Sequence, residues 1–349
     1  MCFIANDDLA VPDDVRSIGK ILETAGFNVF MNFKFRNFCF DIIARKGTNL
    51  LIFKVTQNID RLKPTQTEEL KFLAHILQGT PFIVAERNRR DPLENDTIYK
   101  RDEIIAINFK TFQNIILYQQ NPHIIAKRGG FIVRIDGPKL RKVREEANIS
   151  RSTIASELGV SKKAIVNYEQ DRMNISLESV QVLKKRFQVD FTVPIEILQI
   201  HPKVELPIRQ GESSFEKEID QELVKIGLQT FWTKRAPFEL FLNQIIQKTE
   251  AGQPILKSLT EWNQPIITGV SETDKTDIQK KIEIVSKLSE LKNKVLVIVD
   301  DASKLEDKAK IAIPVMEEGE LRKLSSSKEF INLLDKRSQK LKREKDSSA

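Results

Sequence analysis

The sequence predicts a mixed fold class, α/β plus all-α, with α/β segments toward both ends of the chain. Hydrophobic residues make up 40% of the 349 residues, which is enough to build two or three separate cores. In the outer segments, short apolar runs of strand length alternate with stretches of helical apolar spacing. Between residues 138 and 187 only the helical spacing is present. These observations together predict two α/β domains around a helical one.

Residues 1–128 have the pattern of one α/β unit. An amphipathic helix with apolar positions from Val15 to Ala25 ends at Gly26, a residue that suits a helix C-terminus. A hairpin-like turn at residues 46–49 separates two apolar runs that have strand character. The expected elements after the first helix are strands at 27–30, 39–44 and 50–55, a helix around 70–77, strands at 81–85 and 104–107, and a helix at 111–117.

The central segment from Pro138 to Phe187 has the pattern of short helices joined by a tight turn. Gly159 lies at that turn, where the chain needs a residue that tolerates positive φ. Ser161, two residues later, is a preferred N-cap for the helix that follows. Two helices joined in this way form a helix-turn-helix. Their apolar faces are Ile154, Ala155 and Leu158 in the first helix and Val160, Ala164, Ile165 and Tyr168 in the second.

This pattern resembles the Cro/C1-type helix-turn-helix of phage repressors, and the resemblance covers about fifty residues at fixed spacing. It implies a DNA-binding domain of four or five helices. The alternative is a small helical bundle that shares the pattern by coincidence. The matching positions are Leu140, Arg144, Ser150, Ile154, Ala155, Leu158, Gly159, Val160, Ser161, Ile165, Tyr168 and Glu169, followed by Ser176, Leu177 and Glu178.

The second helix of such a pair enters the DNA major groove, where its N-terminal residues reach base edges. Lysine can donate to guanine, asparagine can pair with adenine, and a valine methyl can contact thymine. A helix N-terminus favours phosphate, and the resemblance implies that Arg151 contacts phosphate and braces the second helix. For the two lysines, the alternative is a solvated helix start. The expected DNA-binding residues are therefore Arg151, Ser161, Lys162, Lys163, Val166 and Asn167.

Residues 1–128 resemble the restriction-endonuclease-like fold through Asp41 on one strand and Lys54 on the next. Active members carry a second acidic residue two positions before the lysine, and the carboxylates hold a divalent metal ion. Ile52 occupies that position here, and its hydrocarbon side chain cannot bind Mg²⁺, which takes oxygen ligands. Glu23 on the first helix could supply one oxygen. The sequence predicts a nuclease-like scaffold with no catalytic residues and no metal.

Residues 215–336 repeat the plan of the first α/β domain, which indicates an internal duplication. Phe40-Asp41 aligns with Phe238-Glu239, and Gly269 stands where the second copy would need its lysine. Prolines and polar residues before the repeat indicate a linker. The expected domains are the nuclease-like domain at 1–128, the helix-turn-helix domain at 129–192, a linker at 193–214, the second α/β domain at 215–336 and a basic disordered tail at 337–349.

The composition of the chain favours an anionic partner and argues against a membrane, secreted or metal-binding protein. The net charge of +7 suits an anionic partner, and the basic tail could alternatively be an arm that binds phosphate. No apolar run approaches the roughly twenty residues that a membrane helix needs. The acidic start of the chain lacks the basic region of a signal peptide. Cys2, Cys39 and three scattered histidines form no metal or disulfide pattern. We therefore expect a cytoplasmic protein without a cofactor.

The whole chain resembles archaeal helix-turn-helix transcriptional regulators, in which a Cro/C1-type domain lies in the middle of a longer chain. Weak motifs at residues 235–238 and 267–270 add to this layout. The resemblance implies a sequence-specific regulator of transcription that binds double-stranded DNA. Because such domains read paired half-sites, we expect a homodimer with the α/β domains as its scaffold. Two alternatives are a metal-dependent DNA nuclease guided by the helix-turn-helix and a DNA-associated adaptor that binds other proteins.

Overall fold

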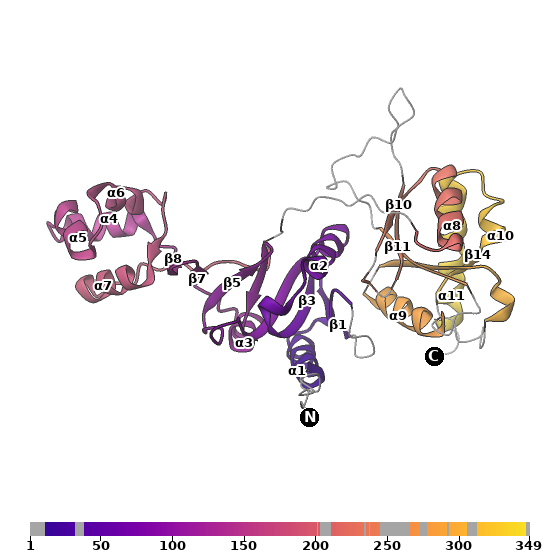
Figure 1. The fold of residues 1–349 in the computed structure, drawn as a ribbon, viewed down its shortest axis with the longest axis horizontal. Helices are drawn as coiled ribbons and strands as arrows, with labels where there is room; N and C mark the ends of the chain where they lie inside the picture. The colour runs from indigo at the N-terminus through magenta and orange to yellow at the C-terminus, as the bar shows by residue number, and fades with distance from the viewer. Residues whose placement is uncertain are drawn as a thin grey trace, which may run out of the picture. The chain divides into compact units, whose positions relative to one another are not determined.

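The computed structural model describes residues 11–31, 38–200, 202, 211–233, 235–236, 238–244, 265–272, 278–291, 293–305 and 313–346 (Figure 1). The chain divides into two compact units, each built from separate stretches of sequence. The first unit contains residues 1–26, 53–67 and 80–202, and the second contains residues 27–52, 68–79 and 203–349. Strand β3 (Asn49–Asn58) and helix α2 (Pro64–Ile76) contribute residues to both units.

The α/β part of the first unit has a sheet in which β4 pairs with β6 in parallel and β6 pairs with β5 antiparallel. Its core is aromatic: the ring of Phe53 stacks on Phe82 at 5.6 Å and meets Phe112 edge-on at 5.5 Å. The expected strands and helices are present. Strand β5 was not predicted from the sequence. The elements are α1 (Val11–Thr24), η1 (Ile59–Arg61), β4 (Thr80–Arg87), β5 (Thr97–Arg101), β6 (Ile104–Ile107) and α3 (Phe109–Tyr118).

A narrow ribbon of strands leads from this sheet to the helical part of the unit (Figure 1). Strand β7 (Ile124–Lys127) pairs in parallel with β5 and antiparallel with β8 (Gly130–Val133). The two-residue strand β9 (Ile175–Ser176) then pairs with the other edge of β8. Neither β7 nor β9, the two partners of β8, was predicted from the sequence. The helical part is therefore joined to the sheet by backbone hydrogen bonds.

The helical part contains the predicted helix-turn-helix. Leu140, Ile154 and Ile165 come from three different helices and are fully buried in one apolar core. Gly159 has a φ of +63°, so the turn between the two helices uses the conformation that the sequence predicted for it. The helices are α4 (Gly137–Glu146), α5 (Arg151–Leu158), α6 (Lys162–Glu169) and α7 (Leu177–Phe187).

The stretch after the helical part differs from the linker expected at 193–214. The backbone N–H of Ile195 donates to the carbonyl of Pro122 at 2.8 Å, and Thr80 Oγ1 donates to the carbonyl of Leu198 at 2.8 Å. Ile197 is fully buried. Residues 193–200 therefore pack against the first unit, because apolar side chains between the prolines find a place in its core. Residues 203–210 of the expected linker lie outside the described residues.

The second unit contains the antiparallel pair β1–β2 and a five-stranded sheet in the order β10-β11-β12-β13-β14. In that sheet β10, β11 and β12 pair antiparallel, whereas β12, β13 and β14 pair in parallel. Helices α8 and α11 share one apolar core with the sheet. The elements are β1 (Asn28–Met31), β2 (Ile42–Lys46), α8 (Ser214–Lys225), β10 (Leu228–Trp232), β11 (Leu240–Gln244), β12 (Ile266–Ser271), α9 (Ile278–Glu290), β13 (Lys294–Val299), η3 (Ala302–Lys304), β14 (Val315–Glu317), α10 (Glu318–Leu321) and α11 (Ser327–Asp346).

Helix α11 corrects the expectation of a disordered tail from residue 337. The helix continues to Asp346, and residues 347–349 lie outside the described residues. Arg337 anchors this part of the helix, since its guanidinium pairs with Glu320 at 2.5 Å and donates to the carbonyl of Val315. A basic stretch can thus remain helical where one of its cations is bound by the preceding elements. No described helix is long and apolar enough to cross a membrane.

Candidate nucleic-acid interface

The start of helix α6 is fixed by a side-chain cap. Ser161 Oγ accepts a hydrogen bond from the backbone N–H of Ala164 at 3.1 Å. Ser150 caps α5 in the same way, accepting from the N–H of Thr153 at 3.0 Å. Serine is preferred at this position because its oxygen satisfies an amide that the helix leaves unpaired. Both helices of the pair therefore begin at the residues that the sequence predicted.

A buried carboxylate holds the far end of α6. The side chain of Glu169 is only 1% exposed and accepts from Arg144 Nε at 2.5 Å and Arg144 Nη2 at 3.3 Å. Arg151 Nε adds a third contact to Glu169 at 2.8 Å. The hydrogen bond with Glu169 also raises the pKa of the Arg144 guanidinium. One carboxylate thus ties α6 to both α4 and α5, so α6 has a defined orientation.

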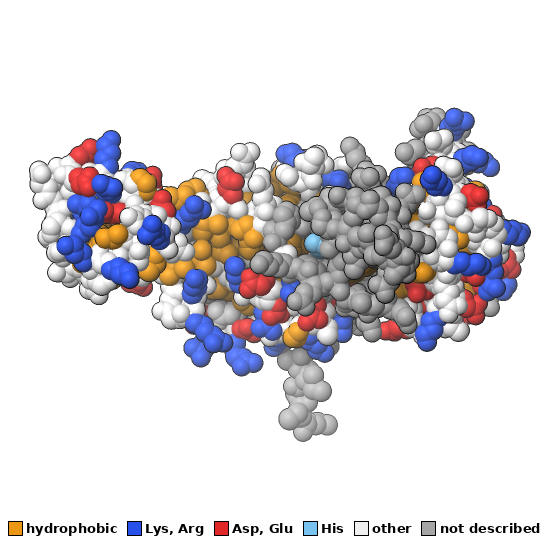
Figure 2. All heavy atoms as spheres, turned by 90° about the horizontal axis from the view of Figure 1, so that it is seen from above, with side chains coloured by type: hydrophobic (Ala, Val, Ile, Leu, Met, Phe, Trp, Pro, Cys, Tyr) orange, Lys and Arg blue, Asp and Glu red, His pale blue; other side chains and the backbone are white. Residues whose placement is uncertain are grey.

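The residues expected to bind DNA gather at the start of α6. Ser161, Lys162 and Lys163 are exposed, whereas Val166 and Asn167 are half-buried one turn later. Neither lysine forms an ion pair with any residue that the structure describes. Arg151 lies on α5 and pairs with Glu169 on α6 at 2.8 Å. Contact between these residues and DNA stays a prediction. Figure 2 shows Lys and Arg side chains over the surface of this helical part.

Gly137, a buried residue behind this surface, supports the position of α6 and was not predicted from the sequence. A Cβ atom at this position would lie 2.1 Å from the carbonyl oxygen of Tyr168, at the end of α6. The Gly137 N–H also donates to Asp171 Oδ1 at 2.8 Å. Only glycine allows α4 to approach the backbone of α6 so closely. Its place before Pro138, at the start of a helix, was the one signal in the sequence.

The nuclease-like positions lack the second acidic side chain that active members carry. Asp41 and Lys54 are each 7% exposed, and Ile52 is fully buried. The side chain at the second acidic position is thus a hydrocarbon in an apolar setting, which offers a hard cation no oxygen ligand. Among the described residues, no group of three or more His, Cys, Asp and Glu side chains could hold a metal ion. The residues present therefore do not fit the divalent ion that this fold uses in active nucleases.

In the second α/β segment, Glu239 is the residue that the predicted duplication would align with Asp41. Lys281 from α9 pairs with Glu239 Oε1 at 2.5 Å, and the N–H of Val270 donates to Glu239 Oε2 at 2.9 Å. Burial raises the pKa of Glu239, and the lysine opposes that shift. Lys281 was not predicted from the sequence because it comes from a helix rather than from the strand. The carboxylate of Glu239 is therefore engaged by Lys281 and by the backbone N–H of Val270.

A capped helix-turn-helix with a basic, exposed start on its second helix defines a DNA-binding protein of the helix-turn-helix class. Residues 140–193 match the Helix-turn-helix family, and residues 13–122 match the PD-(D/E)XK superfamily domain. Both predicted resemblances are confirmed at the level of the family.

The whole chain also has curated relatives in archaea. A protein of Thermococcus gammatolerans is 31% identical over 91% of this chain and 94% of its own length. Relatives from Thermococcus kodakarensis and Pyrococcus horikoshii are 30% and 31% identical over 94% and 92% of this chain, and over 96% of their own lengths. All three are named "Putative HTH-type transcriptional regulatory protein". The chain belongs to this family of archaeal HTH-type transcriptional regulators. No solved structure matches the chain.

Proposed function

We propose that the chain regulates transcription by placing α6 in the major groove of a specific double-stranded DNA site. The observation that carries this proposal is the exposed start of α6, held at both ends by Ser161 and Glu169. Lys162, Lys163 and Asn167 supply donors that can read base edges, and Val166 supplies a methyl group for thymine. The N-terminal amides at Ser161 and the guanidinium of Arg151 contact the phosphate backbone.

The test is to measure the affinity of Lys162→Ala for a preferred site and for unrelated duplexes. Loss of a base contact should cost about 1–3 kcal/mol on the preferred site and little on the others. An equal loss on every duplex would assign Lys162 to phosphate instead. Lys225→Ala, on α8 outside the helix-turn-helix, is the matched control and should bind like the parent protein. No loss on any duplex for Lys162→Ala would count against α6 as the reading helix.

We infer that the active form is a homodimer. The chain carries one helix-turn-helix match, whereas such domains reach useful affinity and selectivity by reading two half-sites about one helical turn apart. The mass of the protein–DNA complex and the length of its footprint test this inference together. One chain bound to a single unpaired half-site would contradict it.

We further propose that the two α/β segments arose by duplication, with domains at 1–128, 129–192 and 215–336. In support, both segments run through a helix, three strands, a helix and a strand in that order. In each segment the first two strands pair antiparallel, as β1–β2 or β10–β11. Two later strands of each segment pair in parallel, as β4–β6 or β13–β14. Residues 211–349 expressed alone should unfold cooperatively; a fragment without fixed packing would contradict this division.

The duplicated segments also share reciprocal contacts inside the second unit. Phe72 of α2 packs against Phe231 of β10 at a ring distance of 6.5 Å, while α9 of the second copy lies against β1 of the first. The N–H of Cys39 donates to the carbonyl of Arg235 at 2.8 Å, and these residues lie before β2 and β11. Contacts of equivalent elements in both directions are what a two-fold pairing of two copies produces.

We propose that these segments serve as a scaffold and not as an enzyme, in a regulator that works in the cytoplasm. The support is Ile52 at the acidic position and the Glu239–Lys281 pair in the second copy. Supercoiled plasmid incubated with Mg²⁺ or Mn²⁺ should remain intact. Cleavage that disappears in an Asp41→Ala, Lys54→Ala double variant would establish the nuclease alternative. A protein that protects no preferred site in footprinting of genomic fragments would favour the adaptor alternative.

A further inference from the structure

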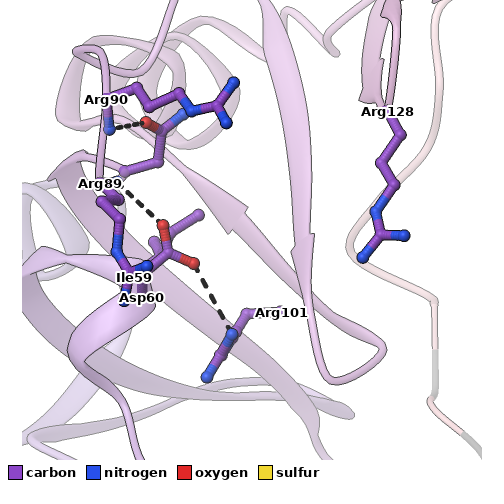
Figure 3. A pocket seen from close by; sticks show the side chains of 7 residues that line it. Ile59, Asp60, Arg89, Arg90, Arg101 and Arg128 are labelled. Carbon is purple, nitrogen blue, oxygen red and sulfur yellow. Dashed lines mark hydrogen bonds and ion pairs between the residues drawn. The ribbon is translucent and has the colours of Figure 1, made fainter.

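The first unit contains a basic pocket that the DNA-binding proposal does not use (Figure 3). Its cavity volume is about 620 Å³, within the range of small-molecule sites. Three parts of the unit form its walls: η1, the loop between β4 and β5 with the end of β5, and the turn between β7 and β8. The lining residues are Ile59, Asp60, Asn88, Arg89, Arg90, Arg101 and Arg128.

The pocket has a strong excess of positive charge, because four arginines face a single aspartate. The carboxylate of Asp60 is already engaged: its Oδ2 accepts from the backbone N–H of Arg89 at 2.9 Å, and its Oδ1 lies 3.6 Å from Arg101 Nη1. Arg101 also donates to the carbonyl of Leu62 at 3.0 Å. Its buried Nε has no hydrogen-bond acceptor among the described residues, and the nearest carboxylate oxygen is Asp102 Oδ2 at 3.6 Å.

The other three arginines, Arg89, Arg90 and Arg128, are exposed, and their guanidinium groups pair with no carboxylate in the described part of the chain. Arginines that serve only for solubility do not need to converge on one cavity, and like charges held together repel each other. Figure 3 shows Arg128 on a separate strand pair, across the pocket from Asp60 and Arg89. The arrangement therefore suits a ligand with more than one negative charge.

The loop that carries two of these arginines has a defined conformation. Asn88 Oδ1 accepts from the N–H groups of Arg90 and Asp91, each at 2.8 Å. The N–H of Asn88 donates to the carbonyl of Asp91 at 2.9 Å, which closes the turn. Together with the Asp60 contact, these bonds fix the backbone of Arg89 and Arg90 before any ligand arrives. A site that is ordered in advance loses less entropy on binding.

We propose that this pocket binds a phosphorylated small molecule of nucleotide size that carries two or more phosphate groups. Guanidinium groups match phosphate oxygens in geometry and remain charged at all physiological pH values. The lining residues come from three parts of the unit and surround a volume of about 620 Å³, a size that suits a small ligand. Arg128 lies in the turn before β8, in the strand ribbon that leads into the helix-turn-helix. A ligand bound to both Arg128 and Arg89 would therefore contact the ribbon and the sheet at the same time.

The test is calorimetric titration of the full chain with ATP and with pyrophosphate, in the absence of DNA. We expect saturable binding of both, and a loss of at least about tenfold in affinity for Arg128→Gln and for Arg89→Gln, as for charged hydrogen bonds. The matched control is Lys127→Gln, which removes the same charge from the neighbouring residue outside the lining. Its affinity should equal that of the parent protein.

Three outcomes would overturn the proposal. The first is no binding of either compound by a folded chain that still binds DNA. The second is an equal loss in Lys127→Gln, which would mean general attraction of anions to a basic surface. The third is weaker binding of bare duplex DNA by Arg128→Gln without any binding of ATP, which would assign the pocket to DNA phosphate. An effect of ATP on DNA affinity would depend on the proposed DNA-binding function. The titration with ATP and pyrophosphate alone tests the pocket without that function.

Discussion

At the scale of single residues, the buried carboxylate of Glu169 does the most to fix the reading helix. Both Glu169 and Arg144 were matched positions of the helix-turn-helix pattern, but the sequence did not reveal that they pair. They are 25 residues apart, and the spacing within one helix says nothing about a partner on another. Local capping by Ser150 and Ser161 was predictable, because each cap acts within three residues of its own helix.

We predict that Glu169→Ala destabilises the helical part by up to about 3–5 kcal/mol, because the buried guanidinium of Arg144 then keeps only Glu145, a half-exposed carboxylate, as its counter-charge. The measurement is the hydrogen-exchange protection of residues 137–187. Glu157→Ala is the control, since Glu157 pairs with Arg186 at the surface, where both side chains are about one third exposed. That exposed pair should contribute under about 1 kcal/mol. Equal losses in the two variants would contradict the role given to Glu169.

Asp190 provides a prediction of pH dependence. A hydrogen bond from Lys184 Nζ at 2.6 Å, followed by one from the N–H of Thr192, lowers the pKa of Asp190 well below its ordinary value of 3.8. A lowered pKa in the folded state stabilises the protein above pH 3.8, and this contribution is lost as the pH falls below that value. Because both side chains are at least half exposed, the contribution is under about 1 kcal/mol.

Asp190→Asn should therefore reduce protection of α7 at pH 7, and the difference from the parent protein should shrink as the pH approaches 3. The same hydrogen-exchange measurement at several pH values provides the check. A difference that grows on acidification would show that the Asp190 carboxylate does not act in this way.

At the scale of elements, the sequence predicted those with strong local signals and missed short strands that lack such signals. The helices of the central domain have clear apolar faces, and Gly159 marks their turn. Strands β5, β7 and β9 were missed because they are at most five residues long, and β9 pairs only with the distant strand β8. Residues 193–200 were expected to be a linker on the evidence of prolines, yet Ile197 is fully buried. Prolines indicate that a segment forms no regular helix or strand, but they do not indicate whether its side chains are buried.

Gly137 gives a prediction at this scale. Gly137→Ala should push α4 away from the end of α6 and destabilise the helical part by about 1–3 kcal/mol, as other overpacked sites are. Protection of residues 162–169 should fall, and affinity for DNA should fall with it. Gly319→Ala in α10 is the control, because no atom lies within 4 Å of a Cβ atom there. That change should leave stability the same or slightly higher, since alanine favours helix.

At the scale of the whole molecule, the class of protein was predictable and the arrangement was only partly so. The helix-turn-helix pattern and the nuclease-like layout both have confirmed family matches. The basic pocket had no comparable signal. Arg89 and Arg90 follow a strand in sequence, but Arg101 and Arg128 join them only through the pairing of β5 with β7. Residues that come together through strand pairing have no characteristic spacing in the sequence, so the sequence does not reveal the pocket.

The net charge of +7 leads to a prediction for the intact protein. Affinity for DNA should fall steeply as salt rises from about 50 to 200 mM, because each phosphate contact releases counterions. A filter-binding titration gives the slope of log affinity against log salt concentration. Replacing a phosphate-binding lysine should make that slope shallower by about 0.9, whereas replacing a base-reading lysine should leave it nearly unchanged. Affinity independent of salt would be incompatible with DNA binding through this basic surface.

The chain enters and leaves the helical part at adjacent points. The N–H of Val193 donates to the carbonyl of Arg134 at 2.9 Å, and the N–H of Asp136 donates to the carbonyl of Phe191 at 2.9 Å. The helix-turn-helix part is thus an inserted segment whose first and last residues are hydrogen-bonded to each other. Such a segment can be exchanged for one of different sequence preference while the ends keep their positions. Within the family, we therefore expect the preferred DNA sequence to vary while the nuclease-like domain stays the same.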